Sequence, residues 1–205
     1  MSTGDLRFDL QVRLDPRWVE LPVGDDGDLD NWAASTVHDA LVLRGRTETP
    51  AVRTLLVQAW AALVEQLRAR PEAGLPVPSG AYALLSDEDL LPLTVAELTG
   101  HPLATGSFDA FVDALVVARS ERFAEPELTE VTTGLGTAVR LQQLRVIEGM
   151  ADEDATVETS VVYAWPGPGQ TCAFTLSAWF GSPVDAEVCR PVLDQLAASV
   201  RRVQG

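Results

Sequence analysis

The sequence predicts an α+β fold, a three-layer α/β/α sandwich in which helices flank a predominantly antiparallel sheet of about six to eight strands. Two stretches rich in β-branched and aromatic residues, 156–165 and 171–180, flank a Pro- and Gly-rich loop, a pattern that predicts a hairpin. An amphipathic stretch at 184–203 follows and predicts a helix. Because such a helix must bury its apolar side, we expect it to cover a sheet to which the rest of the chain contributes.

Length and charge limit the classes of protein that fit this sequence. A chain of 205 residues with 46% hydrophobic residues can bury a sizeable core, and we expect a single α+β domain over 1–205. The net charge of −15 repels phosphate backbones and anionic headgroups, which argues against nucleic acid as a partner. No run approaches the roughly 20 apolar residues of a membrane span, and the start of the chain lacks the pattern of a signal peptide. We therefore expect a cytoplasmic protein.

The first part of the chain alternates between strand and helix patterns. Apolar and polar residues alternate over 6–14, which predicts a strand. Apolar residues then recur at three- and four-residue spacing over 29–44 and 51–70, which predicts two helices, the second opened by Pro50. The Pro- and Gly-rich segment 71–80 is expected to be a loop inside the domain.

The acidic loop at 24–30 permits two interpretations. Asp26, Asp28 and Asp30 have the spacing of the first half of a calcium-binding EF-hand loop. Asn31 and Val37, however, occupy the positions of its turn Gly and its bidentate Glu. We therefore expect no metal site, and expect Asp28 or Asp30 to cap the following helix.

The second part of the chain is predicted to be mainly strands. We expect strands at 81–85, 91–98, 127–133 and 137–147, and a helix at 107–121. The apolar phase slips at Gln142 and Gln143, which predicts a β-bulge there. In the last helix, the expected core stripe repeats every four residues at Val184, Val188, Val192, Leu196 and Val200, and Leu193 and Ala197 broaden it.

No pattern typical of a catalytic or cofactor site is present. His38 has no nucleophile nearby in the sequence, and His101 lies in a loop-like stretch, where we expect it to be exposed. The spacing of Cys172 and Cys189 fits neither a redox pair nor a zinc set; buried thiols are favoured, although the strand and the helix that carry them could meet. A Gly-Leu-Gly turn at 134–136 lacks the third Gly of a dinucleotide-binding fingerprint. We expect no cofactor and no metal.

Four side chains remain as candidates for an interaction site or a pocket. Arg140, Tyr163 and Trp165 lie on neighbouring predicted strands. Tyr163 and Trp165 are two residues apart in one strand and therefore share a face, where we expect them in the core or at its rim. Trp179 lies on the opposite side of its strand from Phe174, which shares a face with Leu176 and Phe180. Packing beneath a second helix and docking of a partner are both open interpretations of Trp179.

Several segments resemble a known group of proteins. They are GTAVR at 136–140, VVYAW at 161–165, FTLS at 174–177 and LAASVRR at 196–202. With the order of the expected elements, they resemble the PsbP-like superfamily, which includes extrinsic photosystem proteins, a Ran-binding nuclear transport factor and bacterial DcrB-like proteins. The resemblance implies a sandwich around an antiparallel sheet, and mostly non-catalytic work as a binding protein or as a chaperone of secreted proteins.

Two functions from different classes follow from the sequence. The first is a non-catalytic cytoplasmic protein-binding module, such as an adaptor or a secretion-associated chaperone, whose protein partner the sequence does not identify. The second is a small-molecule-binding protein or an enzyme with a pocket on the sheet. A homo-oligomer is compatible with either function.

Overall fold

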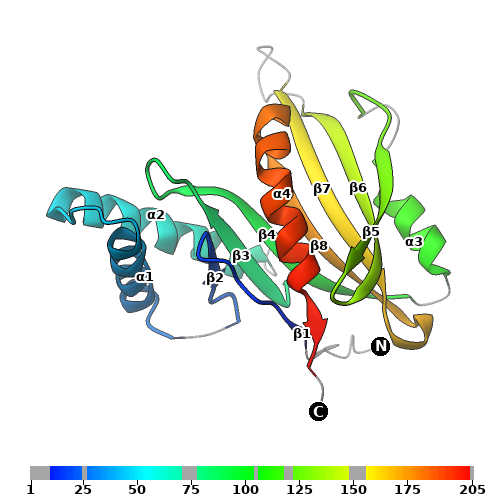
Figure 1. The fold of residues 1–205 in the computed structure, drawn as a ribbon, viewed down its shortest axis with the longest axis horizontal. Helices are drawn as coiled ribbons and strands as arrows, with labels where there is room; N and C mark the ends of the chain where they lie inside the picture. Colours follow the sequence, from blue (N-terminus) through cyan, green and yellow to red (C-terminus); the bar gives the residue numbers. More distant parts are fainter. Residues whose placement is uncertain are drawn as a thin grey trace. The chain divides into compact units, whose positions relative to one another are not determined.

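The chain forms two compact units. The computed structural model describes residues 10–24, 27–70, 78–103, 106–117, 122–147 and 156–203 (Figure 1). Unit 1 comprises Met1–Asp15 and Ala96–Gly205, and unit 2 comprises Pro16–Val95. The expectation of a single domain over 1–205 stays a prediction.

The main sheet has seven antiparallel strands in the order β2-β3-β4-β8-β7-β6-β5, which confirms the predicted fold class. Its strands are β2 (Trp18–Leu21), β3 (Gly80–Leu85), β4 (Pro92–Pro102), β5 (Glu127–Thr133), β6 (Gly136–Ile147), β7 (Thr156–Pro166) and β8 (Cys172–Phe180). A separate pair consists of β1 (Leu10–Gln11) and β9 (Arg201–Arg202). The helices are α1 (Leu29–Leu43), α2 (Pro50–Arg68), α3 (Phe108–Leu115) and α4 (Pro183–Ser199), and a 3₁₀ turn, η3 (Pro168–Gln170), joins β7 to β8.

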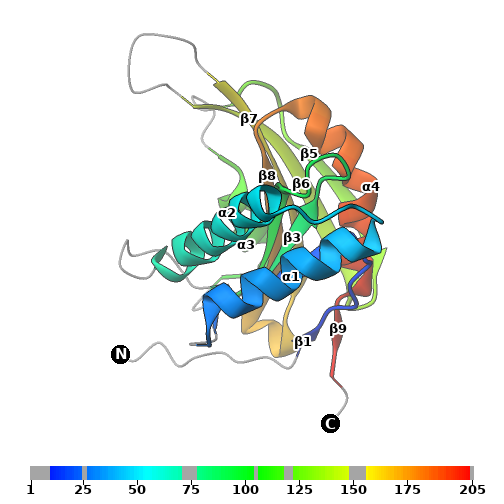
Figure 2. The ribbon, with the colours of Figure 1, turned by 90° about the vertical axis from the view of Figure 1, so that its left-hand side faces the viewer.

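In unit 1 the strands lie between α4 on one face, which Figure 2 shows beside β5 to β8, and α3 on the other. Side chains on alternate strand positions mark the two faces. Tyr163 of β7 donates a hydrogen bond to Asp194 of α4. Gln143 of β6 donates to the carbonyl of Leu115 at the end of α3. The three-layer arrangement is therefore confirmed within this unit.

The hairpin of β7 and β8 has the predicted parity. Phe174, Leu176 and Phe180 are at most 2% exposed and share the α4 face with Tyr163. Trp179 points to the other face and is 36% exposed. Apolar side chains on both faces of one hairpin indicate strands that are covered on both sides.

Helix α4 buries the later part of the predicted stripe, at Leu193, Leu196, Ala197 and Val200, but not its start, and the helix ends at Ser199 instead of 203. Val184 and Val188 are each 70% exposed, whereas the buried residues are Ala186, Cys189, Leu193, Leu196 and Ala197. A repeat of four residues turns by about 40° at each step around a helix with 3.6 residues per turn. The predicted stripe therefore spirals away from the sheet towards the start of the helix, and only its later members reach the core.

Strand β6 contains no bulge at Gln142 and Gln143, in contrast to the prediction. Its pairing with β7 continues without a shift from Val139 to Ile147. The apolar phase changes because Val139 and Leu141 face α3, whereas Leu144 lies in register with Thr159 on the α4 face. A strand covered on both faces can carry apolar residues of either parity.

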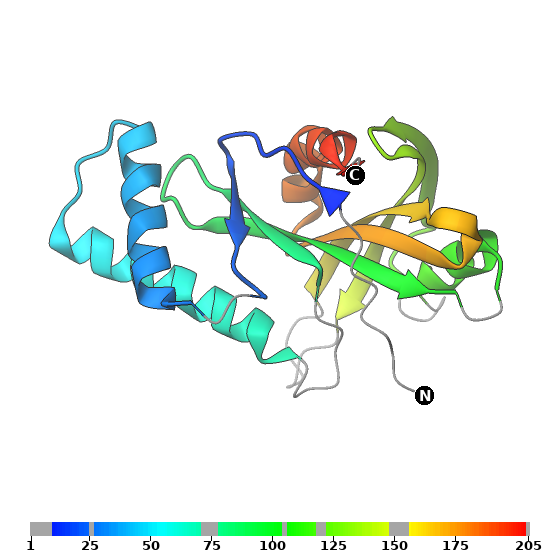
Figure 3. The ribbon, with the colours of Figure 1, turned by 90° about the horizontal axis from the view of Figure 1, so that it is seen from below.

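Unit 2 has its own hydrophobic core. Strand β2 pairs with β3 from Trp18 to Leu21. Helices α1 and α2 cross, as Figure 3 shows, and Trp32 packs edge-on against Trp60 with ring centroids 6.2 Å apart. The core residues of this unit are Leu21, Ala33, Val37, Ala40, Leu41, Leu56, Trp60, Val64, Leu67, Ala81, Ala83, Leu85 and Leu90.

Polar contacts fix the ends of the unit 2 helices. Asp28 accepts a hydrogen bond from the backbone N–H of Asn31 at 3.1 Å, which confirms it as the cap of α1. Arg44 binds the carboxylate of Asp87 at 2.9 Å. The calcium interpretation of the acidic loop involves Asp26, and positions 25 and 26 lie outside the described residues.

Other boundaries differ from the predictions by a few residues. Of the strand predicted over 6–14, positions 6–9 lie outside the described residues, and β1 covers Leu10 and Gln11, which pair with Arg202 and Arg201 of β9. Strand β4 runs to Pro102 because it pairs with β8 along its second half. His101 is therefore in a strand and half-buried, not in an exposed loop; its ring lies 5.1 Å from that of Phe111, and burial lowers its pKa.

A substitution at Gly134, in the turn between β5 and β6, tests the packing in unit 1. A Cβ atom there would lie 2.8 Å from the carbonyl oxygens of both Ala198 and Val200. We expect Gly134→Ala to lower the free energy of unfolding by about 1–3 kcal/mol, because backbone atoms cannot move aside as a flexible side chain can. Denaturation followed by Trp fluorescence measures this. The control is Gly181→Ala, whose added methyl would have no atom within 4 Å; equal loss in both variants would contradict the packing.

Candidate functional site

Strand β5 forms the outer edge of the sheet in unit 1. It pairs with β6 on one side only. Residues 127–130 are all exposed, in contrast to β7 and β8, which are mostly buried. Within the described residues, no other segment forms a backbone hydrogen bond with its outer edge. Such an edge offers unpaired N–H and C=O groups to an added strand.

The hydrogen-bond pattern identifies the outward-facing backbone groups. Residues of an antiparallel strand alternate between bonding to one neighbour and to the other. The N–H of Gly167 donates to the C=O of Cys172 in register with the β7–β8 pairing, so odd-numbered residues of β7 bond to β8 and even-numbered residues bond to β6. The odd-numbered residues of β6 therefore bond to β7, and its even-numbered residues bond to the odd-numbered residues of β5. The even-numbered residues Leu128, Glu130 and Thr132 then direct their N–H and C=O groups to the outer edge.

The end of β5 is held in place by contacts with the core and with α4. The buried indole of Trp165 donates to Thr133 Oγ1 at 2.8 Å. The N–H of Gly134 donates to the carbonyl of Ala198 at 3.0 Å. The tip of the β5–β6 hairpin is therefore fixed, and the strand is pre-organised before any partner binds.

A pocket of about 330 Å³ lies between β5 and α4, and we call it the α4-side pocket. It is lined by Val131, Thr132, Thr133, Tyr163, Asp194, Gln195 and Ala198. The register places Val131 on this face, opposite Ala138 of β6. The pocket thus runs along the inner side of the edge strand.

A polar network forms one wall of the α4-side pocket. The Tyr163 hydroxyl donates to Asp194 Oδ1 at 2.5 Å, and Arg140 Nη1 lies 3.1 Å from the same oxygen. Burial, followed by the hydrogen bond and the charge of Asp194, raises the pKa of Tyr163. The hydroxyl therefore stays protonated and acts as a donor, which does not suit it to be a base at neutral pH.

A second pocket, of about 300 Å³, lies between β5 and α3, and we call it the α3-side pocket. It is lined by Asp109, Val112, Asp113, Leu128, Thr129, Glu130 and Val139. Three of these residues are acidic and none of the described lining residues is basic. The edge strand is therefore flanked by one pocket on each face.

Three of the four predicted site residues lie together. Arg140, Tyr163 and Trp165 share the α4 face, and the rings of Tyr163 and Trp165 stack with centroids 6.3 Å apart. Both aromatic residues are at most 1% exposed, as expected for core residues. Trp179 lies on the opposite face, beside Ser160 in the register, and does not join them.

Sequence reasoning missed Asp194 and the exposed edge of β5. Asp194 follows the buried Leu193 in α4, and an acidic residue at that position could have been matched to Arg140. The composition of β5 indicates an edge strand, because Glu and Thr occupy positions on both of its faces. A central strand covered on both faces would carry apolar residues there.

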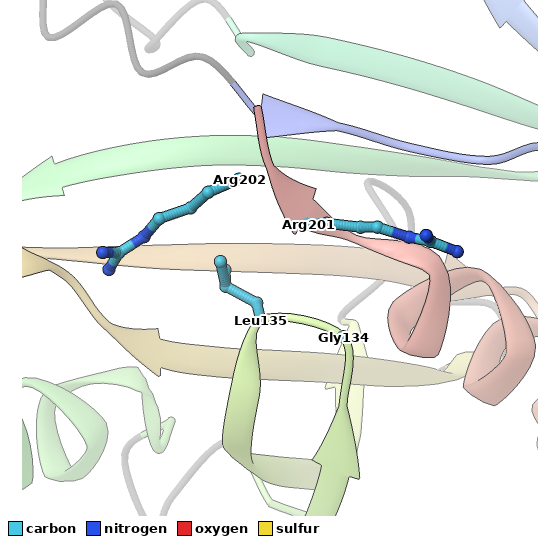
Figure 4. A pocket seen from close by; sticks show the side chains of 4 residues that line it. All are labelled: Gly134, Leu135, Arg201 and Arg202. Carbon is cyan, nitrogen blue, oxygen red and sulfur yellow. The ribbon is translucent and has the colours of Figure 1, made fainter. Parts of the chain in front are cut away.

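Other features of the described residues offer less chemistry. A pocket of about 620 Å³ is lined by Gly134, Leu135, Arg201 and Arg202, but the two Arg side chains extend in opposite directions (Figure 4) and do not converge on one ligand. His38 contacts Glu48 at 3.0 Å in an exposed pair. Cys172 and Cys189 are free and buried.

The described residues contain no group of three or more His, Cys, Asp or Glu side chains placed to hold a metal ion. Among them, no helix combines the length and the apolar character needed to cross a bilayer. Comparisons of the chain with protein-family models, with curated proteins and with solved structures found no match.

The network beside the α4-side pocket gives a measurable coupling. We expect Tyr163→Phe to cost about 1–2 kcal/mol of unfolding free energy, because it removes a hydrogen bond to a charged acceptor. In a double-mutant cycle with Asp194→Ala, we expect a coupling of about 1 kcal/mol. The matched control pairs Tyr163→Phe with Asp185→Ala, an acidic residue in the first turn of the same helix, and should be additive. Additivity in both cycles would contradict the network.

Proposed function

We propose that this chain is a non-catalytic cytoplasmic protein-binding module that holds an extended segment of another protein as an added strand beside β5. The observation that carries the proposal is the outer edge of β5, where Leu128, Glu130 and Thr132 direct their backbone groups away from the sheet. Strand addition obtains affinity from main-chain hydrogen bonds and specificity from pockets that receive alternate side chains.

The two pockets beside β5 support the proposal. Side chains of a strand alternate between its two faces. An added strand would therefore direct every second side chain to the face that carries the α4-side pocket and the others to the face that carries the α3-side pocket. A binding role of this kind also fits the resemblance to the PsbP-like superfamily, in which an adaptor or a secretion-associated chaperone is an expected role.

A small-molecule-binding protein is the second candidate. The α4-side pocket, at about 330 Å³, falls at the lower end of the range typical of ligand sites. Tyr163 and Asp194 place polar groups in its lining, and Arg140 binds Asp194 beside it. In this candidate Arg140 and Tyr163 orient a ligand, and neither acts as a base or a nucleophile.

Selection of peptides from an unbiased display library against the whole chain tests the first proposal. Bound peptides should slow amide hydrogen exchange at Leu128, Glu130 and Thr132. Thr132→Pro should weaken their binding about tenfold, because it removes one outward N–H while sparing the bonds to β6. Thr132→Val keeps the N–H and should bind as the unmodified chain does.

Far-UV circular dichroism checks that Thr132→Pro folds, and Leu128→Pro provides a second block at the other end of β5. Selected peptides that bind both Pro variants as tightly as the unmodified chain would contradict strand addition. If no peptide is selected and a metabolite mixture yields a ligand whose binding requires Tyr163 and Arg140, the second candidate replaces the first.

A further inference from the structure

We infer that the segment that pairs with β5 is basic and has a period of two: Lys or Arg residues face α3, and the apolar residues between them face α4. This inference rests on the proposed function, because it specifies the partner of the same strand. The charge and the lining of the two pockets support it.

The register of β5 assigns each pocket to one set of side chains in the partner. Leu128 and Glu130 pair with Leu141 and Val139 of β6, so their side chains lie on the α3 face. In a neighbouring strand, the residue opposite a given position directs its side chain to the same face. Partner residues opposite Leu128 and Glu130 therefore lie on the α3 face, beside the α3-side pocket, and a partner residue opposite Val131 lies on the α4 face, beside the α4-side pocket.

The α3-side pocket suits a long basic side chain. Asp109 and Asp113 from α3 and Glu130 from β5 line it with carboxylates. Val112 is 6% exposed and, with Val139, provides an apolar floor. Lys and Arg side chains lay their aliphatic stems along such a surface while the charged group reaches the carboxylates at its rim.

The α4-side pocket suits an apolar side chain. Val131, Tyr163 and Ala198 contribute apolar surface to its lining. Its carboxylate, Asp194, is already engaged by Arg140 and Tyr163, so its charge is largely matched before a partner arrives. The two sides of the strand therefore differ in the chemistry that they accept.

The charge of the chain argues against a second copy or an acidic segment as the occupant. An antiparallel pairing of β5 with β5 of another copy that is centred on Glu130 would place the two Glu130 side chains opposite each other on the α3 face, and like charges directly opposite on neighbouring strands are destabilising. The net charge of −15 opposes that approach at longer range and favours a basic segment. A basic partner is thus the occupant that both the pockets and the whole chain favour.

The rival explanation of the same acidic residues is protection of the edge. Charged side chains on an edge strand discourage unwanted pairing between proteins. A binding measurement distinguishes the two explanations. If the acidic residues recognise a partner, a peptide with alternating basic and apolar residues should bind saturably; if they only protect the edge, no such peptide should bind.

Fluorescence anisotropy with designed peptides tests the inference on the whole chain. The probes are a labelled peptide of alternating Val and Lys, a peptide of alternating Val and Glu, and a peptide with the same Val and Lys residues in two separate blocks. We expect saturable binding of the first, with the second and third weaker by about tenfold or more. The affinity of the first should fall as salt is added, because the charges lie near the surface.

Two double variants separate the pocket from the overall charge. Asp113→Asn with Glu130→Gln should weaken binding of the alternating Val and Lys peptide about threefold to tenfold. Asp39→Asn with Glu65→Gln changes the net charge equally on exposed faces of α1 and α2 and should leave the affinity unchanged. Equal losses in both double variants, or undiminished binding of this peptide to Thr132→Pro, would overturn the inference.

The outcome also distinguishes this inference from the proposed function. If library-selected peptides require β5 but the two charge types bind equally well, strand addition stands and the basic partner is rejected. If no peptide of any kind depends on the edge of β5, both are rejected. Binding that depends on the edge, on the alternation and on the α3-side carboxylates supports both.

Discussion

The continuous antiparallel pairing of β6, β7 and β8 is the interaction on which the rest of unit 1 depends. The β6–β7 pairing runs without a shift from Val139 to Ile147, and the β7–β8 pairing from Thr159 to Pro166, so each strand keeps a fixed face towards α4 and another towards α3. Because helices cover both faces, the strands can carry apolar residues at either parity. The faces of β7 and β8 are therefore mostly committed to packing, whereas in the described residues the outer edge of β5 carries no backbone pairing.

The edge strand β5 combines a fixed backbone with available hydrogen-bonding groups. Trp165 and the end of α4 hold its tip, while Leu128, Glu130 and Thr132 direct their main-chain groups outward. A partner strand would meet groups that are already in place, which lowers the entropy lost on binding. The pockets on the two faces then distinguish partners by side chain: carboxylates on the α3 side favour basic residues, and the apolar lining on the α4 side favours aliphatic ones.

The sequence predicted most elements, and its errors have physical causes. Strand alternation and turn residues located β5 to β8 within one residue at each end, and the parity of Trp179 was correct. The α4 stripe failed at Val184 and Val188 because a four-residue repeat does not follow one helix face, and the bulge in β6 failed because that strand carries apolar residues on both faces of a continuous pairing. The candidate site was predicted only in part: Arg140, Tyr163 and Trp165 were named, but their link through Asp194 and the role of β5 depend on contacts between distant segments.

Native-state amide hydrogen exchange of the free chain, measured by NMR, tests the central claim most directly. The account predicts an alternation along β5: fast exchange at Leu128, Glu130 and Thr132, whose N–H groups face outward, and slow exchange at Thr129, Val131 and Thr133, which bond to β6. Protection at Leu128, Glu130 and Thr132 equal to that of their neighbours would contradict the account, because the edge would then already be paired in the free protein.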